Sequence, residues 1–224
     1  MKLYSYCLRY DDGAAPNPYH KLCTLAICKP RIRSVAKVDD WIVGLGSKHS
    51  CLGDISESVV YAMKITDVLT FEEYDKYCLS SLPEKLPDWR SQVFQKKIGD
   101  CIYDYGRGNP PTIRESVHTE GNRKSDLDGK NVLLSNHFYY FGDKPINLAD
   151  HLMPIVHRTQ GHKSHANDDY VDKFVDWIET LGYSVNDLQG EPQLKSYIVN
   201  SDPAECRTHC SNNDMIENTE DGWC

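Results

Sequence analysis

Short apolar runs, separated by turn residues, organise the first half of the chain. Alternating or β-branched stretches predict strands at residues 2–9, 22–27, 41–45 and 59–66. A basic segment separates the second run from the third and contains Lys29, Arg31, Arg33 and Lys37. We expect this segment to be an extended connector in which Arg31 and Arg33 point to the same side.

Helical periodicity is strongest late in the chain, where apolar residues recur every three or four positions from 168 to 181 and Gly182 follows. The sequence Thr70-x-x-Glu73 predicts a capped helix over 69–79. Weaker patterns predict short helices at 88–97 and 147–153, a strand at 98–105, a strand pair or bent strand at 131–141, and a long polar loop at 106–128. This order predicts an α+β fold with a curved, mainly antiparallel sheet or partial barrel and a few flanking helices.

The pattern fades beyond Ser184, which predicts one domain over residues 1–183 and a flexible tail over 184–224. This tail holds two basic and eight acidic residues, so it carries −6 of the net charge of −8. The remaining body is nearly neutral at −2, and a local basic patch there could still meet a polyanion.

The lengths of the apolar stretches and the positions of the cysteines allow predictions about the cellular compartment and about metal binding. No run is long enough to span a membrane, and the N-terminus lacks signal-peptide features, so we expect a cytoplasmic protein. The first six of the nine cysteines lie mostly in apolar surroundings and are then expected to be reduced core residues, with disulfides as the alternative: Cys7, Cys23, Cys28, Cys51, Cys78 and Cys101. A tail set could ligate zinc, although a floppy reduced tail explains the same residues: Cys206, His209, Cys210 and Cys224.

Three segments carry candidate chemistry. The basic connector offers Arg31 and Arg33 to a phosphate or base, or is simply a solvated loop. The polar loop contains His118 and Asp126, which suit a general acid/base pair, a divalent-metal site or a soluble loop. The turn of Gly161, His162 and Lys163 precedes the late helix and could bind an anion there. Aromatic residues such as Trp41 could stack a base or belong to the core.

The motifs LAICKPRIR, DDWIVGLGS, VVYAMKITDVLTFEEY, IGDCIYDY, VLLSNHFYYFG and QGHKS occur in that order. This series resembles the second nucleotide-modification-associated domain family, bacterial and phage proteins linked to DNA base modification and phage–host conflict. The resemblance covers about residues 3–181 and matches the family at Lys29, Pro30, Arg33, Trp41, Gly44, Gly46, Ser47, His118, Asn122, Asp126, Phe138, Phe141, Gly142, Gly161 and His162. Lys163 stands where the family usually has arginine. A looser likeness to base-reading barrels of the PUA, ASCH and EVE kind rests on fold analogy.

These observations lead to three hypotheses. In the first, the protein binds a nucleotide or modified DNA base. Trp41 stacks the base, and the phosphate side is held by Lys29, Arg31, Arg33, Ser47, Asn122, Gly161, His162 and Lys163. In the second, an enzyme uses His118 and Asp126 on a nucleotide or nucleobase. In the third, the acidic tail binds a partner. The sequence identifies neither a cofactor nor an oligomeric state, and the first two hypotheses require the three segments to meet.

Overall fold

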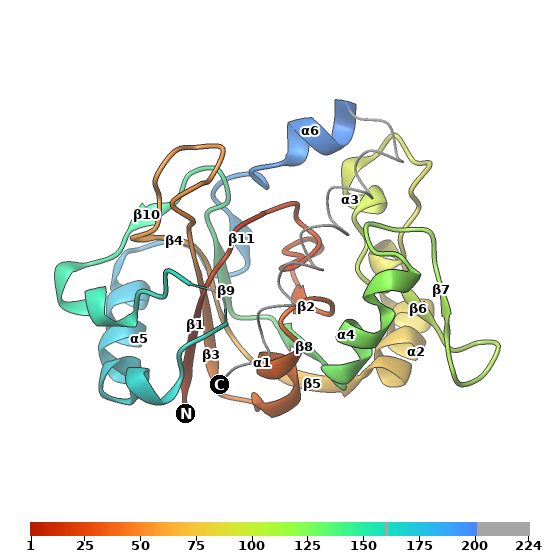
Figure 1. Ribbon diagram of the computed structural model, residues 1–224, viewed down its shortest axis with the longest axis horizontal. Helices are drawn as coiled ribbons and strands as arrows, with labels where there is room; N and C mark the ends of the chain where they lie inside the picture. Colours follow the sequence, from red (N-terminus) through yellow and green to blue (C-terminus); the bar gives the residue numbers. More distant parts are fainter. Residues whose placement is uncertain (160, 201–224) are drawn as a thin grey trace.

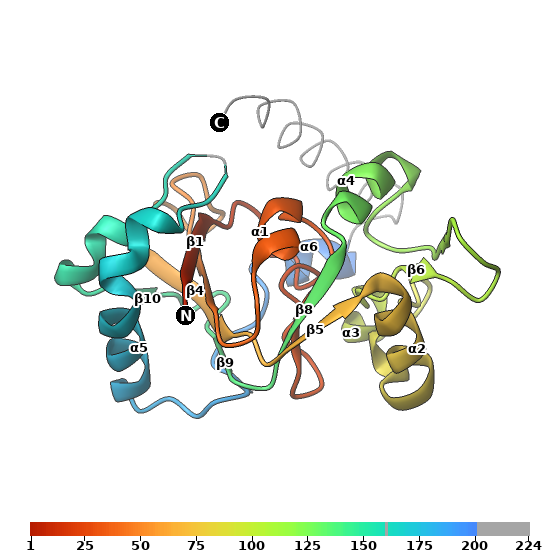
Figure 2. The same cartoon turned by 90° about the horizontal axis from the view of Figure 1, so that it is seen from below.

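A six-stranded sheet lies at the centre of the protein (Figures 1 and 2). The computed structural model describes residues 1–159 and 161–200. Strand order in this main sheet is β1-β3-β4-β9-β11, with β10 pairing with β4. The strands are β1 Leu3–Cys7, β3 Trp41–Leu45, β4 Ser58–Lys64, β9 Phe138–Tyr140, β10 Ile146–Asn147 and β11 Asp187–Leu188.

The main sheet is mixed in direction. β1 runs parallel to β3, and β11 runs parallel to β9, whereas the β3–β4, β4–β9 and β4–β10 pairs are antiparallel. All five residues of β3 are buried, which explains its unbroken apolar sequence. The prediction of a mixed helix-and-strand protein is confirmed, and no strands within the described residues close a barrel.

A second, three-stranded antiparallel sheet has the order β2-β8-β5, with β2 Cys23–Leu25, β8 Asn131–Ser135 and β5 Asp67–Thr70. β8 and β9 lie in different sheets, so residues 131–141 form a bent segment and not a strand pair. The backbone N–H of His137 donates to Ser135 Oγ at 3.1 Å where the chain changes sheets. The chain thus links the two sheets at this point.

Most helices are short. The α-helices are α1 Pro30–Val35, α2 Phe71–Ser81, α3 Phe94–Lys97, α4 Arg123–Asp128, α5 Val171–Thr180 and α6 Lys195–Asn200. The 3₁₀ turns are η1 Pro83–Lys85, η2 Glu120–Asn122, η3 Asp150–Ile155 and η4 His165–Tyr170. Figures 1 and 2 show α5 on one side of the main sheet and α2, α3 and α4 on the other. No helix in the described ranges is both long enough and apolar enough to cross a membrane.

The two strongest helical patterns predicted their helices well. Thr70 Oγ1 accepts the backbone N–H of Glu73 at 3.2 Å, and the Glu73 carboxylate accepts the N–H of Thr70 at 2.8 Å. This reciprocal capping box starts α2. Phe174 and Ile178 are buried on the face of α5 that packs against the main sheet. The capping box of α2 and the apolar periodicity of α5 were therefore sufficient to predict these two helices from local sequence.

The basic connector is a helix, which corrects the prediction of an extended segment. Pro30 occupies the first turn of α1, where its fixed φ suits a helix and its missing N–H costs nothing. Residues two apart on a helix diverge by about 200°. Arg31 is accordingly exposed, whereas Arg33 is buried.

Three further predictions need correction. Only Tyr103–Asp104, named β6, is a strand within 98–105, and its partner is β7, Thr112–Ile113. The polar segment 106–128 is not one loop, because it contains β7, η2 and α4. Residues 184–200 belong to the fold, since β11 extends the main sheet and Ile198 is buried in the core. The rest of the predicted tail lies outside the described residues.

Apolar side chains form a cluster on each face of the main sheet. One lies between that sheet, the second sheet and α2, and includes Tyr4 and Tyr6 of β1. The other lies between the sheet and α5, and includes Leu3 and Trp41. Alternation along β1 therefore places Tyr4 and Tyr6 on the face toward the second sheet.

A buried polar network, the Lys85 cluster, consists of Asn17, Thr24, Tyr74, Lys85 and Asp100. The Lys85 ammonium donates to Asn17 O at 2.9 Å, Asn17 Oδ1 at 2.7 Å, Leu22 O at 2.9 Å and Thr24 Oγ1 at 3.0 Å. Asp100 accepts hydrogen bonds from Thr24 and from Tyr74, the latter at 2.7 Å. All five side chains are buried, so this network ties the N-terminal loop to the α2–η1 region.

Candidate functional site

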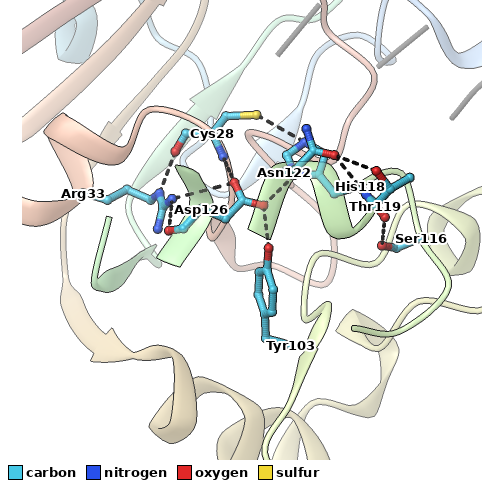
Figure 3. Close-up of polar contacts among 8 residues, drawn as sticks. All are labelled: Cys28, Arg33, Tyr103, Ser116, His118, Thr119, Asn122 and Asp126. Atoms are coloured by element: carbon cyan, nitrogen blue, oxygen red, sulfur yellow. Dashed lines mark hydrogen bonds and ion pairs between the residues drawn. The ribbon is translucent and has the colours of Figure 1, made fainter. Parts of the chain in front are cut away.

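Asp126 of α4 joins segments that are far apart in the sequence (Figure 3). Its Oδ2 lies 2.6 Å from His118 Nδ1 and accepts the Tyr103 hydroxyl at 2.9 Å. Its Oδ1 accepts the backbone N–H of Cys28 at 3.0 Å. Together with Arg33, these residues form the Asp126 cluster: Cys28, Arg33, Tyr103, His118 and Asp126.

Charge and hydrogen bonding keep the Asp126 carboxylate ionised. Burial raises the pKa of Asp126, but His118, Arg33 and the Cys28 N–H outweigh that effect and leave the pKa below its ordinary value. The neighbouring Tyr103 hydroxyl has a raised pKa because it is buried beside this carboxylate, so it stays a hydrogen-bond donor. An ionised carboxylate only accepts hydrogen bonds, so Nδ1 of His118 carries the proton.

The other nitrogen of the His118 ring faces a thiol. His118 Nε2 lies 3.7 Å from Cys28 Sγ, within hydrogen-bonding range for sulfur. His118 is 5 % exposed and Asp126 1 % exposed, whereas Cys28 is partly exposed. When His118 is neutral its proton lies on Nδ1, and the Nε2 lone pair then faces the thiol proton. This arrangement can accept and return a proton at the sulfur atom.

Cys28 lies on the turn between β2 and α1. Its φ is +57° and that of Lys29 is +42°, so two consecutive non-glycine residues adopt the left-handed conformation. The sequence predicts Cys28 only as one of the mostly apolar, reduced cysteines, and not its position beside His118. The available signal was its position immediately before Lys29-Pro30, at the junction of a predicted strand with a proline that can start a helix.

Arg33 does not present its guanidinium to a phosphate, which corrects that prediction. It is 0 % exposed and donates to Cys28 O at 2.6 Å, Asn131 O at 2.8 Å and Asp126 O at 2.7 Å. A Cβ on Gly129 would lie 2.4 Å from the guanidinium carbon, so glycine is needed there. Arg33 thus fixes the Cys28 turn to α4 and β8.

Trp41 does not offer a face to a base, which corrects the stacking prediction. Its ring is 1 % exposed and packs edge-on against His137 and Phe174, with centroids 5.5 and 6.1 Å away. It belongs to the cluster between the main sheet and α5, whereas Tyr4 and Tyr6 belong to the cluster on the opposite face. Trp41 is therefore a core residue.

The Cys28 turn and the Gly161–Lys163 turn both contact tyrosine rings of β1. Lys29 Nζ lies 4.9 Å above the Tyr6 ring, and the His162 ring lies 5.8 Å from that of Tyr4. Tyr4 and Tyr6 share a face of β1, about 7 Å apart along the strand. The His118 loop thus touches the Cys28 turn directly, whereas the Gly161–Lys163 turn lies two strand positions farther along.

The remaining predicted binding residues make local contacts. Lys163 pairs its backbone with Ser5, and its ammonium donates to Val156 O at 2.8 Å. Asn122 Oδ1 accepts the N–H of Thr119 at 2.9 Å, in the turn that leads into α4. Ser47 Oγ accepts the N–H of His49 at 3.1 Å in the loop after β3. Of these three, only Asn122 lies on the segment that carries His118 and Asp126 (Figure 3).

Metal and cavity features lie apart from this cluster. No group of three or more His, Cys, Asp or Glu residues within the described part of the chain is arranged to hold a metal ion. The predicted zinc set in the tail lies outside the described residues: Cys206, His209, Cys210 and Cys224. A cavity of about 550 Å³ lies elsewhere, and its lining includes Asp54, Glu57 and Asp150. Its carboxylates make it unsuited to a phosphate.

Comparison with known proteins identifies the family. A family model described as nucleotide modification associated domain 2 matches residues 1–199, which include every residue of the Asp126 cluster. No curated protein and no solved structure matches the chain. The resemblance inferred from the ordered motifs is thus confirmed, and the match extends beyond residue 183 through β11 and into α6. The chain belongs to the nucleotide modification associated domain 2 family.

Proposed function

We propose that the protein is an enzyme that acts on a nucleotide or nucleobase, with His118 and Asp126 as its acid/base pair. The observation that carries this proposal is the 2.6 Å contact between His118 Nδ1 and Asp126 Oδ2. A carboxylate that fixes the imidazole in one tautomer leaves Nε2 available to move protons. Membership in a nucleotide-modification family supports a nucleotide or nucleobase as the substrate class.

Simple binding of a nucleotide or modified base is less well supported. That hypothesis assigned phosphate contacts to Arg33 and stacking to Trp41, and both side chains are buried in protein contacts. Lys29 and His162, which contact two tyrosines on the same face of β1, remain candidates for a phosphate. They would serve an enzyme as well as a binding protein, so they do not favour binding alone.

The test compares the full chain with His118→Ala expressed in a bacterial host. Free nucleotides and the nucleosides of digested DNA are then compared by mass spectrometry. We expect a nucleotide or nucleoside whose mass changes with the wild-type chain and not with His118→Ala. His151→Ala is the matched control, because His151 is exposed and lies on η3, away from the Asp126 cluster.

If wild type and His118→Ala co-purify with the same unaltered nucleotide, and neither changes the cellular pool, the protein is a binding module and the enzyme proposal is wrong.

A further inference from the structure

One carboxylate positions both a thiol and an imidazole. Asp126 accepts the backbone N–H of Cys28 with Oδ1 and contacts His118 Nδ1 with Oδ2. Arg33 closes the same unit by donating to the carbonyls of Cys28 and Asp126. The 3.7 Å separation of Cys28 Sγ from His118 Nε2 is therefore set by buried hydrogen bonds. Such fixed geometry is what a nucleophile and its base require.

The backbone at Cys28 supports the same conclusion. Left-handed conformations at non-glycine residues cost about 1–3 kcal/mol each and persist where the surroundings enforce them. Cys28 and Lys29 both adopt this conformation, with φ +57° and +42°. A cysteine that merely filled the core would need neither the strained turn nor the partly exposed position that Cys28 has. The turn directs the thiol to the imidazole.

We propose that Cys28 is the nucleophile of a Cys28–His118–Asp126 triad that transfers or hydrolyses an acyl group. The nucleotide or nucleobase as carrier of that acyl group rests on the proposed function, whereas the triad rests on geometry alone. An amide or ester carbonyl suits this site because its cleavage requires an attacking nucleophile and a proton for the leaving group. A thiol and an imidazole in contact supply both.

The reaction proceeds in two balanced halves. His118 Nε2 takes the proton of the Cys28 thiol as sulfur attacks the carbonyl carbon, an S–C bond forms, and the carbonyl π pair moves to oxygen. When that pair returns, the bond from carbon to the amine or alkoxide breaks, and the leaving group takes the proton from His118. Water or an acceptor amine then attacks the thioester carbon, passes a proton to His118, and the carbonyl π pair moves to oxygen. When that pair returns, the C–S bond breaks, sulfur takes the proton from His118, and the free acid or the new amide leaves.

The test uses p-nitrophenyl acetate with the full-length protein, because this ester needs no nucleotide. We expect rapid p-nitrophenol release and an acetyl thioester on the Cys28 peptide that hydroxylamine removes. Cys28→Ser should lose the thioester, and His118→Asn should slow acetylation by about 10²–10⁴-fold. Cys51→Ser is the matched control, because Cys51 is exposed and lies outside the Asp126 cluster, and it should react like wild type.

Folding of each variant is verified from its urea midpoint and circular dichroism. The triad is wrong if acetylation maps elsewhere than Cys28, or if folded His118→Asn is acetylated as fast as wild type.

The triad and the proposed function can fail separately. If the nucleotide change in cells is lost with His118→Ala but kept with Cys28→Ser, the enzyme proposal stands and the triad is wrong. If Cys28 is acetylated in a His118-dependent way but no nucleotide changes, the triad stands and the nucleotide enzyme proposal is wrong.

Discussion

The Asp126 and Lys85 clusters have similar composition but differ in what surrounds them. Each contains a carboxylate, a tyrosine that donates to it and a buried cation. In the Lys85 cluster every named side chain is buried, and the ammonium donates to four oxygen atoms of the protein. In the Asp126 cluster the imidazole Nε2 faces the partly exposed Cys28 thiol.

The buried carboxylates of the two clusters have pKa values shifted in opposite directions. Burial lowers the pKa of Lys85 and raises that of Asp100, which is the effect expected when desolvation dominates. Asp126 is equally buried, yet its pKa is lowered because His118, Arg33 and the Cys28 N–H outweigh desolvation. Burial alone therefore does not identify a site. The Asp126 cluster is distinguished instead by an ionised carboxylate, an imidazole and a partly exposed thiol that contact one another in that order.

The largest expected effect is on the chemistry of the Asp126 cluster. Asp126→Asn removes the charge that orients and stabilises the His118 imidazolium, so acetylation of Cys28 by p-nitrophenyl acetate should fall on the order of 10³-fold. Asp128→Asn, on the same helix but exposed, is the control and should keep the wild-type rate. A wild-type rate in folded Asp126→Asn would remove the carboxylate from the mechanism.

The next effect is on stability and should leave the chemistry intact. Lys85→Met leaves four buried oxygen atoms without their donor and removes the cation that lies one hydrogen bond from Asp100, so it should lower the free energy of unfolding by about 3–5 kcal/mol in urea titrations. Below the unfolding transition its Cys28 acetylation rate should match wild type. Lys76→Met is the control, because its ion pair with Glu72 is exposed. Loss of Cys28 reactivity in folded Lys85→Met would mean that the two clusters are coupled.

Asp11 provides an intermediate case, a buried carboxylate whose hydrogen-bond partners are neutral. It accepts the Tyr140 hydroxyl at 2.7 Å, and burial raises its pKa to about 7. Between about pH 4 and pH 7 the folded state therefore retains a proton that the unfolded state has lost. This group's contribution to stability should fall by a few kcal/mol as pH rises through that window.

Asp11→Asn tests this effect because it cannot titrate but can still accept the Tyr140 hydrogen bond. The change in unfolding free energy between pH 4.5 and pH 8 should be smaller for this variant than for wild type. Identical pH slopes would show that Asp11 titrates alike in both states.

The smallest effect concerns Lys29, beside the Cys28 turn. If its ammonium contacts a substrate phosphate, Lys29→Met should weaken binding of a deoxynucleoside monophosphate by about threefold to tenfold, roughly 1 kcal/mol. Binding of the unphosphorylated deoxynucleoside should not change in calorimetric titrations. The exposed Lys37→Met serves as the charge-matched control. Equal weakening for both ligands would place Lys29 outside the phosphate site.

Elements whose structure depends on a single segment of sequence formed as predicted. The capping box of α2, the apolar periodicity of α5 and the β-branched run of β4 depend on neighbouring residues, and all three elements formed. His118 and Asp126 were predicted as a pair because a histidine with nearby carboxylates suits acid/base chemistry, and the two side chains are in contact.

The failures depended on contacts between distant segments. Arg33 is buried because carbonyls from Cys28, Asp126 and Asn131 converge on it, which no local pattern encodes. Trp41 and Cys28 both lie in apolar sequence. Only the packing of α5 over the sheet makes the first a core residue, and only the approach of His118 makes the second a candidate nucleophile.

Competitive alkylation of the native protein tests the contrast between the two clusters most directly. Iodoacetamide at pH 7 is followed by peptide mass spectrometry at Cys28, at exposed Cys51, and at Cys23, which is buried near Lys85 and Asp100 with its pKa raised to about 12. We predict that Cys28 reacts at least about tenfold faster than Cys51, that His118→Asn abolishes this excess, and that Cys23 reacts only after unfolding. Equal rates at Cys28 and Cys51, or an excess that survives His118→Asn, would contradict the account.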